Sequence, residues 1–511
     1  MKIAFQKICH IILNEKSAES NSVQVLNSKP DSFSLYLRKG GNKMSTVIPG
    51  NIFREYDIRG AADTELASPI VHEIAKGFGT WLAAHEVKKA AIGGDVRFST
   101  PRISESFING LLETGIDVVD IGVVTTPILY WSLYHLNLEG GVMITGSHNP
   151  KDMNGIKLVY GKATLWGKEI QEVQSVVLSG NFIKPGRKGQ LIHSDIGDDY
   201  IDMLASKIKL APIGDDSSKL LVAYDCGNGT AGLYFSKFIS KLGVKGLPLF
   251  EEPDGCFPNH HPDPQKRENL QHLISLVRSG RADVGIAFDG DADRIGVVDD
   301  QGEVIWGDRL MALYWGEILE KHPGADVLVE VKCSIALPEE VEKRGGNPIF
   351  CQCGHSVMKA KMREIGALFG GEYSGHMFFA DEYYGFDDPF YAAGRLFRIM
   401  ASNRPKELSC IIRRIPEYPT TQESRIDCAD DEKFALIENV KKKLESTYEL
   451  ITCDGVRIVY PDGWGLIRAS NTQPVITTRC EGRTKEALDR ITALVKKLIL
   501  DEGLPNFEWE Y

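Results

Sequence analysis

The chain of 511 residues contains no long uninterrupted apolar run. A helix that spans a bilayer needs about 20 such residues, so we expect no membrane span. The sequence also lacks an excess of positive charge, because 59 Lys and Arg residues stand against 70 Asp and Glu, a formal net charge of −11. Proteins that bind nucleic acids or anionic membrane surfaces present a basic face. We therefore expect neither nucleic acid nor membrane as a partner.

The ten cysteines form no CxxC pair and are scattered along the chain. Cys351 and Cys353 are the nearest to each other, and two residues at this spacing make neither a zinc site nor a disulfide framework. We expect reduced thiols in a cytoplasmic protein.

The first 43 residues differ from the rest of the chain. Residues 1–14 combine a lysine with an apolar stretch, but Lys7 and His10 interrupt it and no small-residue cleavage site follows, which disfavours a signal peptide. Residues 15–43 are rich in Ser, Asn, Lys and Gly. This composition predicts an extension without fixed structure, and Met44 is a candidate for the natural start.

The remaining length predicts several domains, since one hydrophobic core stops growing at about 250 to 300 residues. From Ile52 to about residue 410, short apolar runs alternate with amphipathic stretches of helical length, which is typical of α/β layers. The last hundred residues have fewer such alternations and indicate an α+β unit. The expected parts are an extension (1–43), three α/β domains (44–198, 199–303 and 304–415) and an α+β domain (416–511).

Individual elements can also be predicted from the pattern of apolar residues. The expected strands are 116–124, 141–145, 220–225, 284–288, 295–298, 327–331, 456–460 and 475–480. The expected helices are 70–84, 233–242, 310–320, 432–446 and 484–500.

A hydroxyl-bearing loop follows one of these strands, with the sequence Thr145-Gly146-Ser147-His148-Asn149-Pro150. The glycine allows close approach of the backbone and the proline fixes the turn after it, so the loop can expose Ser147 to a ligand. Taken alone, it could equally be a polar turn. It lacks the glycines of a GxSxG nucleophile elbow.

An acidic loop lies between two apolar strands, with the sequence Asp289-Gly290-Asp291-Ala292-Asp293-Arg294. Three carboxylates this close would raise one another's pKa unless a cation lay between them, and oxygen ligands favour Mg²⁺ or a similar hard ion. An EF-hand would need Gly at Arg294 and Glu at Asp300. A haloacid-dehalogenase-type phosphatase would have Thr or Val at Asp293, and a solvated acidic turn is the remaining alternative.

Two further loops carry groups suited to a sugar phosphate. In Gly371-Glu372-Tyr373-Ser374-Gly375-His376, the side chains of Glu372, Ser374 and His376 would point the same way if the segment were extended, ready to bond vicinal hydroxyls. In Arg468-Ala469-Ser470-Asn471-Thr472-Gln473-Pro474, one guanidinium, two hydroxyls and an amide offer donors to a dianion. A solvated loop and a hairpin turn are the respective alternatives.

Two other motifs could mislead. Gly227-Asn228-Gly229-Thr230-Ala231-Gly232 is a GxGxxG after a strand, as in dinucleotide-binding folds, but it accounts for none of the other four loops. His260 and His261 could suggest a metal, but the two prolines that follow them favour a structural turn.

Taken in this order, and preceded by Phe53-Arg54-Glu55-Tyr56-Asp57-Ile58-Arg59-Gly60, the four loops resemble those of the α-D-phosphohexomutase family, most closely its bacterial phosphomannomutase/phosphoglucomutase branch. The resemblance runs from about Ile52 to the C-terminus. It implies a heart-shaped architecture of four domains, three of mixed α/β type and a C-terminal α+β domain, around a central active site. Tyr373 departs from the methionine common in this branch, and Gly94 departs from a common arginine.

The resemblance also implies residue roles. The phosphoryl group would be carried by Ser147, and the metal would be held by Ser147, Asp289, Asp291 and Asp293. Proton transfer and charge stabilisation would fall to Arg59, Lys157, His376 and Arg294. The substrate would be bound by Tyr56, Lys332, His355, Glu372, Ser374, His376, Arg468, Ser470, Asn471 and Thr472.

The implied enzyme is an intramolecular phosphotransferase, an isomerase that interconverts the 1- and 6-phosphates of mannose or glucose through a 1,6-bisphosphate. Its expected cofactors are Mg²⁺ and hexose 1,6-bisphosphate as activator, and its partners are small sugar phosphates. We expect a monomer or a weak dimer. Phosphoglucosamine mutase is an alternative, as are a sugar-phosphate phosphatase and a noncatalytic sugar-phosphate sensor.

Overall fold

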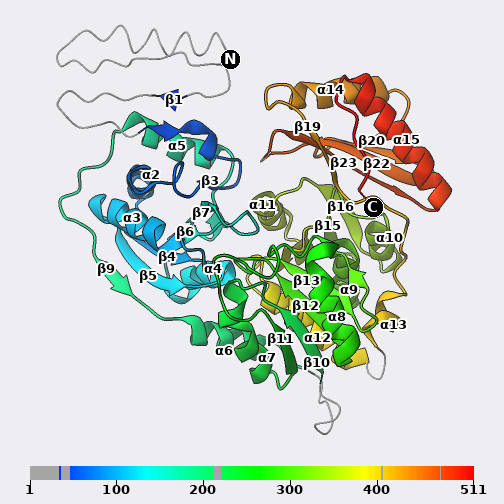
Figure 1. The fold of residues 1–511 in the computed structure, drawn as a ribbon, viewed down its shortest axis with the longest axis horizontal. Helices are drawn as coiled ribbons and strands as arrows, with labels where there is room; N and C mark the ends of the chain where they lie inside the picture. The colour runs from blue at the N-terminus through cyan, green and yellow to red at the C-terminus, as the bar shows by residue number, and fades with distance from the viewer. Residues whose placement is uncertain (1–33, 36–46, 211–219, 404–406, 472, 511) are drawn as a thin grey trace. The chain divides into compact units, whose positions relative to one another are not determined.

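The computed structural model describes residues 34–35, 47–210, 220–403, 407–471 and 473–510 (Figure 1). The chain divides into two compact units, Met1–Ile52 and Phe53–Tyr511. In the first unit, β1 (Ser34–Leu35) pairs antiparallel with β2 (Ile48–Pro49), and the short helix η1 (Gly50–Ile52) follows. Most of the extension predicted at 1–43 lies outside the described residues. Within the described ranges, no helix is long and apolar enough to cross a membrane.

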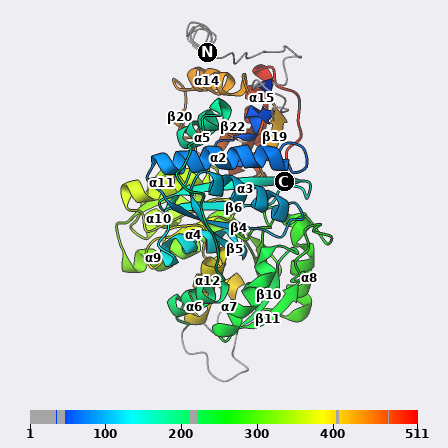
Figure 2. The same ribbon diagram turned by 90° about the vertical axis from the view of Figure 1, so that its left-hand side faces the viewer.

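The second unit begins with a mixed sheet of order β3-β7-β6-β4-β5-β9, to which β8 adds on β7. Its central strands β4, β6 and β7 are buried on both faces. Helices α2, α3 and α5 lie together on one face, as Figures 1 and 2 show, and α4 packs on the other, where Ile128 and Leu133 share a core with Ala91 and Met143. The elements are β3 (Ile58–Ala61), α2 (Ser68–Ala84), β4 (Lys89–Gly94), α3 (Thr100–Glu113), β5 (Asp117–Val123), α4 (Thr126–His135), β6 (Gly140–Ile144), β7 (Met153–Tyr160), β8 (Ala163–Thr164), α5 (Lys168–Ser179) and β9 (Leu191–His193).

A second sheet has the order β11-β10-β12-β13-β14, with the first three strands parallel and the last two antiparallel. Strand β12 is buried along its whole length, and the acidic loop follows it directly. The elements are α6 (Gly197–Lys207), β10 (Leu221–Asp225), η3 (Thr230–Leu233), α7 (Phe235–Lys241), β11 (Lys245–Leu249), η4 (Arg267–Leu270), α8 (Gln271–Gly280), β12 (Val284–Phe288), β13 (Ile295–Asp299) and β14 (Val304–Ile305).

The third region combines a parallel pair, β15 and β16, with an antiparallel hairpin, β17 and β18. Helix α9 contacts both α10 and β17, and α11 contacts β17, so the hairpin is held between helices. The elements are α9 (Gly307–Lys321), β15 (Asp326–Glu330), α10 (Ala336–Lys343), β16 (Asn347–Cys351), α11 (His355–Ile365), β17 (Phe369–Gly371), β18 (Met377–Phe379), α12 (Pro389–Asn403) and α13 (Leu408–Ile412).

The C-terminal region is an antiparallel sheet of order β19-β23-β22-β21-β20. Helices α14 and α15 share one core with the sheet, and Trp464 and Leu466 pack instead against Val331 and Cys353 of the third region. The elements are β19 (Ser424–Asp427), α14 (Lys433–Leu444), β20 (Glu449–Ile451), β21 (Val456–Tyr460), β22 (Gly463–Ala469), β23 (Val475–Gly482) and α15 (Lys485–Asp501), coloured orange to red in Figure 1.

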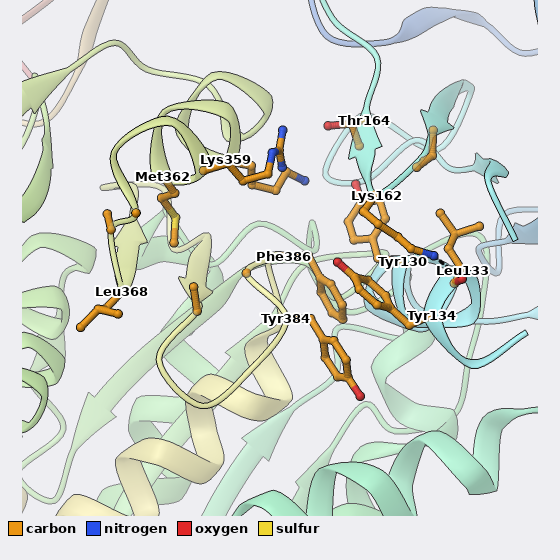
Figure 3. A pocket seen from close by; sticks show the side chains of 16 residues that line it. Tyr130, Leu133, Tyr134, Lys162, Thr164, Lys359, Met362, Leu368, Tyr384 and Phe386 are labelled. Atoms are coloured by element: carbon orange, nitrogen blue, oxygen red, sulfur yellow. Dashed lines mark hydrogen bonds between the residues drawn. The ribbon is translucent and has the colours of Figure 1, made fainter. Parts of the chain in front are cut away.

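A cavity of about 310 Å³ lies between the first and third regions (Figure 3). Its walls come from α4, β7 and β8 on one side and from α11 and the segment after β18 on the other. It is separate from the loops singled out above, although one of its lining residues, Lys359, reaches toward them.

Candidate active site

The Ser147 loop is held in a strained conformation. Ser147 lies just beyond β6 with a φ of 47°, a left-handed conformation that non-glycine residues adopt infrequently, and its side chain is buried. The Arg97 guanidinium donates hydrogen bonds to the carbonyl oxygens of Ser147 (2.8 Å) and Asn149 (2.6 Å). It donates also to those of Pro150 and Met153. Four carbonyl bonds from one rigid guanidinium fix the backbone that carries the serine.

The hydroxyl of Ser147 points at the acidic loop. Its Oγ donates a 2.7 Å hydrogen bond to Oδ2 of Asp289. The two loops also meet through their backbones, because a Cβ on Gly290 would lie 2.5 Å from the Ser147 carbonyl oxygen. The acidic loop therefore needs glycine at this position, and the serine and the first aspartate are held in contact.

All three aspartates of the acidic loop are buried, and one oxygen of each lies within 4.8 Å of one from each of the others. Lys157 on β7 donates to Asp291 Oδ2 (3.0 Å) and makes a short contact with Asp293. Burial disfavours the charge on Lys157, but the Asp291 and Asp293 carboxylates outweigh that effect and raise its pKa well above the usual range. Lys157 is accordingly a cation at neutral pH.

The carboxylate cluster fits a divalent cation. Oδ1 of Asp291 and Oδ1 of Asp293 are buried without a hydrogen-bond partner among the described residues. Burial and the Asp293 and Asp291 charges raise the pKa of Asp289 well above its usual range, which is the signature of carboxylates packed too closely for their charge. An acidic cluster with unsatisfied hard oxygens suits Mg²⁺ or a similar ion.

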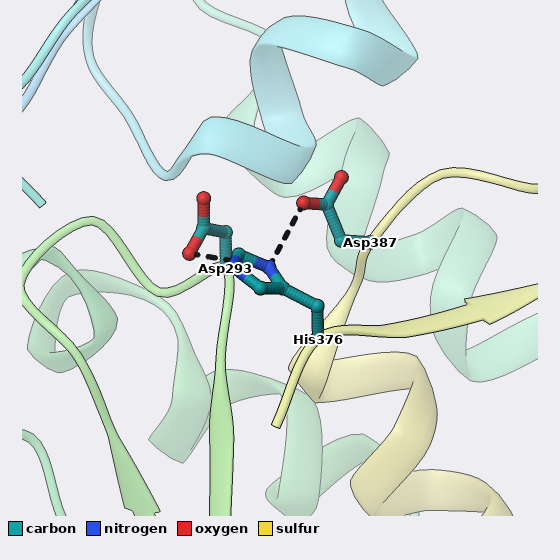
Figure 4. A group of neighbouring side chains, drawn as sticks. All are labelled: Asp293, His376 and Asp387. Atoms are coloured by element: carbon teal, nitrogen blue, oxygen red, sulfur yellow. Dashed lines mark ion pairs between the residues drawn. The ribbon is translucent and has the colours of Figure 1, made fainter. Parts of the chain in front are cut away.

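His376 is held between the acidic loop and a further aspartate (Figure 4). Its Nδ1 lies 3.1 Å from Asp387 Oδ2 and 3.6 Å from Asp293 Oδ1. On the other side of the ring, Arg294 Nε donates to Nε2 (3.0 Å). Since a guanidinium N–H can only donate, Nε2 is the acceptor and the proton of the neutral ring lies on Nδ1, facing the carboxylates.

Two neighbours of His376 extend this network. Lys359 on α11 donates to Asp387 Oδ1 (3.0 Å), and both side chains are buried. Arg294, which donates to His376 through Nε, also donates from Nη1 to Gln265 Oε1 (2.9 Å). His376 and Arg294 are therefore oriented from both sides.

Arg59 lies beside the same cluster from β3. Its Nε donates to Asp57 Oδ2 (2.6 Å). Burial disfavours the charge on Arg59, but the Asp57 carboxylate outweighs that effect and raises its pKa. His148 Nδ1 lies 3.1 Å from Ser147 Oγ, and burial together with the Arg294 and Arg59 charges lowers the pKa of His148 well below its usual range. His148 is therefore neutral beside the serine.

The third loop is a tight turn and not an extended segment, so the expectation of alternating side chains is wrong. Gly375 N donates to Glu372 O, and Glu372 N donates to His376 O, which closes the β17–β18 hairpin. Gly375 has a φ of 91°, and a Cβ there would lie 2.4 Å from the Ile295 carbonyl oxygen. Because this glycine turns the chain, Glu372, Ser374 and His376 are brought together by the turn itself.

Within this turn, Glu372 accepts hydrogen bonds from Ser374 Oγ (3.0 Å) and from the N–H of Gly354 (2.8 Å). Burial raises the pKa of Glu372. The ring of Tyr373 contacts Arg479 on β23, whose guanidinium carbon lies 3.9 Å from the ring centroid. The departure at Tyr373 therefore serves the contact between the third and fourth regions.

The fourth loop joins β22 to β23, so its alternative description as a hairpin connection also holds. Arg468 is buried and its Nε donates to Asp454 Oδ2 (3.1 Å), which also accepts from the N–H of Cys353. Asn471 Nδ2 donates to the hydroxyl of Tyr56 (3.1 Å). Ser470 is buried in the same loop, and Thr472 lies outside the described residues.

Tyr56 connects three regions of the chain. Its hydroxyl accepts from Asn471 and donates to the carbonyl oxygen of Cys353 (3.1 Å). His355 is next to it, with its ring centroid 6.0 Å from that of Tyr56 and 5.5 Å from that of His376. The first, third and fourth regions thus converge at the Tyr56 side chain.

Lys332 spans the third and fourth regions. Its Nζ lies 3.3 Å from Glu330 and 3.3 Å from Glu423. Burial disfavours its charge, but the two carboxylates outweigh that effect and raise its pKa well above the usual range. Lys332 is therefore a cation held between carboxylates of the third and fourth regions.

The two misleading motifs have structural roles. In the GxGxxG segment, Thr230 donates from both its N–H and its hydroxyl to the Gly290 carbonyl oxygen (3.0 Å each), so the segment supports the acidic loop. His260 Nε2 lies 3.0 Å from Asp225 Oδ2 at the end of β10. Among the described residues, neither motif contributes to the clusters of His, Cys, Asp and Glu side chains that lie close enough together to hold a metal ion.

Several residues of the site carry no signal in the linear sequence. Lys359 is separated from Asp387 by 28 residues, and Thr126, which donates to Asp291 Oδ2 (2.6 Å), by 165. Their partners are set by packing between regions. The position of Asp57, two residues before Arg59, is the exception, because a charge pair at that spacing can be seen in the sequence.

Comparison with known proteins gives matches over the four regions. Residues 50–183, 198–302 and 306–418 match the alpha/beta/alpha domains I, II and III of phosphoglucomutase/phosphomannomutase, and residues 423–498 match its C-terminal domain. The matched ranges begin and end close to the four regions described above.

Whole-chain relatives agree. A phosphomannomutase/phosphoglucomutase of Pseudomonas syringae pv. tomato is 40% identical over 467 residues, which are 90% of this chain and 98% of the relative. A phosphoglucomutase of Neisseria gonorrhoeae is also 40% identical, over 90% of this chain and 99% of the relative. A crystal structure of a Burkholderia thailandensis phosphoglucomutase/phosphomannomutase family protein superimposes with a TM-score of 0.83 at 35% identity, covering 91% of this chain and 100% of that one. The chain belongs to the phosphoglucomutase/phosphomannomutase family.

Proposed function

We propose that the protein interconverts hexose 1-phosphate and hexose 6-phosphate, with mannose or glucose as the sugar, through phosphorylated Ser147. The observation that carries the proposal is the 2.7 Å hydrogen bond from Ser147 Oγ to Asp289, at the edge of a buried cluster of three carboxylates. A buried serine in a strained loop, aimed at a cation site, suits a carrier of phosphoryl groups.

Asp289, Asp291 and Asp293 would hold Mg²⁺, together with an oxygen of the phosphorylated Ser147. When bound, the ion would neutralise charge on the transferring phosphoryl group. Oδ1 of Asp291 and Oδ1 of Asp293, for which no hydrogen-bond partner is found among the described residues, support this assignment.

In the forward step, the free hydroxyl oxygen of a sugar monophosphate attacks the phosphorus of phospho-Ser147. The bond from phosphorus to Ser147 Oγ breaks as the new bond forms, and the hydroxyl proton passes to a base. His376 suits this role because its Nε2 is the unprotonated nitrogen and Asp387 faces the other one. Lys157 and Arg59 remain protonated and stabilise the charge that develops on the phosphoryl oxygens.

The product of this step is a hexose 1,6-bisphosphate, which must turn around before the opposite phosphate returns to Ser147. Arg468, Ser470, Asn471 and Thr472 would hold whichever phosphate is not reacting. Glu372, Ser374 and His376 would bond the sugar hydroxyls, with Tyr56, Lys332 and His355 beside them. Added hexose 1,6-bisphosphate would act as the activator by phosphorylating Ser147.

The proposal is tested by phosphorus NMR on the purified protein with Mg²⁺ and a trace of glucose 1,6-bisphosphate. Mannose 1-phosphate, glucose 1-phosphate and glucosamine 1-phosphate are offered separately. We expect the 6-phosphate resonance to appear with mannose or glucose, and the relative rates to name the preferred sugar. Release of inorganic phosphate, or unchanged substrate, would instead support a phosphatase or a sensor.

A further inference from the structure

The cavity between the first and third regions is of a size that suits a small molecule. At about 310 Å³ it falls at the lower end of the range for ligand pockets, and like them it has a mostly apolar lining with a few polar groups. In Figure 3, Met362 and Leu368 face a group of aromatic side chains across the open space. None of the residues assigned to the proposed reaction lines it.

One wall of the cavity is built for a planar ring. Tyr384 and Phe386 stack with an interplanar angle of 5°, and the ring centroids of Tyr134 and Tyr384 are 4.7 Å apart. Tyr130 joins the group through Phe386, at 5.7 Å. Tyr134 and Tyr384 line the cavity and are only partly buried, so part of each side chain is accessible.

The same cavity carries positive charge. Lys162, Lys359 and Arg363 line it, and for Arg363 no ion pair is found among the described residues. Lys162 lies over the Tyr134 ring (4.6 Å), with its Nζ bonded to the carbonyl oxygens of Leu133 and Leu138. Lys359 is neutralised by Asp387, so Lys162 and Arg363 are the two cations beside the aromatic wall, and they favour an anion attached to a ring.

One residue of the cavity wall carries a buried hydroxyl without a hydrogen-bond partner among the described residues. Tyr130 is 5% exposed, and its hydroxyl has no hydrogen-bond partner among the described residues. Leaving a buried hydroxyl unpaired is unfavourable. A ligand with an acceptor atom would satisfy it.

We propose that this cavity is a second ligand site, which binds a small molecule that carries a planar ring and one anionic group. The ring lies against Tyr134 and Tyr384, and the anion bonds Arg363 and Lys162. None of the residues that line the cavity belongs to the sugar loops.

The cavity is coupled to the proposed active site through Lys359. Its Nζ lies 4.4 Å from the centroid of the Tyr130 ring at the cavity wall and donates to Asp387, whose other oxygen faces His376. An anion in the cavity draws the ammonium group away from Asp387 and loosens the support of His376. Occupancy therefore lowers turnover.

Phenyl phosphate is the simplest probe, since it has one ring and one phosphate. Binding is measured by ligand-observed NMR on the full chain with Mg²⁺, with glucose 1,6-bisphosphate present in excess to fill the proposed active site. Inorganic phosphate and phenol are the controls for the anion and the ring. We expect phenyl phosphate to bind more tightly than either, and equal affinity for inorganic phosphate would refute the site.

Variants distinguish the cavity from the phosphate loop. Arg363→Ala and Tyr384→Ala should each weaken phenyl phosphate binding at least about fivefold, the effect of roughly 1 kcal/mol. Lys361→Ala, on the same helix but outside the cavity, should leave binding unchanged. Binding that is lost in Arg468→Ala and retained in Arg363→Ala would place the probe at the phosphate loop and overturn the proposal.

The coupling is tested by turnover at saturating substrate. Phenyl phosphate should lower kcat in the wild type by at least about twofold and leave kcat of Arg363→Ala unchanged. Arg363→Ala should match the wild type without the probe. Binding that depends on Arg363 but leaves kcat unaltered would refute the coupling.

Discussion

Gly146 lies directly against the Arg97 guanidinium: a Cβ on this glycine would be 2.4 Å from Arg97 Nε. Arg97 is itself buried and paired with Asp95 (3.2 Å), which accepts the N–H of Gly146 (3.0 Å). Gly146, which precedes the proposed nucleophile Ser147, is thus confined by Arg97, the side chain that holds the loop.

Gly146→Ala should therefore displace Arg97 and shift the Ser147 backbone. A misplacement of about 1 Å at a reacting group can cost about 100-fold in rate, and we expect kcat to fall by about that factor. The matched control is Gly186→Ala, where a Cβ would meet open space. Steady-state kinetics with glucose 1-phosphate measure both, and equal kcat values in the two variants would contradict this role of the glycine.

Ser147→Ala removes the proposed phosphoryl carrier. Losses for an essential nucleophile approach about six orders of magnitude, or about 8 kcal/mol of barrier. Ser175→Ala, an exposed serine on α5, should keep full activity. Turnover by Ser147→Ala within tenfold of the wild type would be incompatible with a phosphoserine mechanism. Phosphate incorporation, measured by intact mass after exposure to glucose 1,6-bisphosphate, should occur in Ser175→Ala and be absent in Ser147→Ala.

The elements with strong apolar patterns could be predicted from the sequence. Strands β12 and β21 have the predicted bounds, and the helix predicted at 484–500 is α15 (Lys485–Asp501). Each of these elements has one or both faces buried, so the spacing of its apolar residues alone identifies it as a strand or a helix. Strand β22 (Gly463–Ala469) was not predicted, because two glycines and an arginine interrupt its apolar residues, although all seven are buried.

From local patterns alone, the site was predictable only where its residues are neighbours in the chain, and residues such as Lys157 and His355 were implied by the family resemblance. The three aspartates could be read from one loop. In contrast, Tyr56 and Asn471 are separated by 415 residues, and nothing local indicates that they are bonded. The turn at Gly375 was missed because alternation suggests a strand, whereas the contact that demands glycine there is with the distant Ile295. Long-range packing, which a single sequence does not encode visibly, decides such details.

The stability of the protein should fall as pH rises because of Asp388. Burial raises the pKa of this carboxyl to about 6, although hydrogen bonds from Tyr383 (2.6 Å) and Tyr200 (2.7 Å) oppose the shift. The folded state thus holds the proton more tightly than the unfolded chain, whose Asp pKa is near 3.9. The favourable contribution is complete below about pH 4 and is lost as pH rises through 6, on the order of 3 kcal/mol in all.

The measurement compares thermal unfolding of the wild type with Asp388→Asn at pH 4, 6 and 8. The unfolding temperature of the wild type should fall relative to that of the variant between pH 4 and 8. The control is Asp198→Asn, at an exposed carboxylate whose ion pair with Lys237 lowers the pKa of Asp198. Between pH 4 and 8, the difference in unfolding temperature between this variant and the wild type should change in the opposite sense or not at all. A constant difference for Asp388→Asn across this range would show that the carboxyl does not titrate there.

Asp387→Asn tests how His376 is held. In the wild type, Asp387 Oδ2 faces the Nδ1 proton of His376 while Oδ1 accepts from Lys359. An asparagine that keeps its oxygen toward Lys359 presents an NH₂ group to Nδ1, so two donors would meet there. The ring would move its proton to Nε2 and displace the Arg294 Nε that donates to this atom in the wild type. That tautomer cannot accept the proton of a sugar hydroxyl, and kcat should fall by about 100- to 10,000-fold with KM little changed. Nitrogen NMR of labelled histidine should show the change of tautomer, and Asp381→Asn, which loses a pair with Arg395 away from this network, should show neither effect. A normal kcat in Asp387→Asn, with the ring still protonated on Nδ1, would mean that Arg294 alone fixes the histidine.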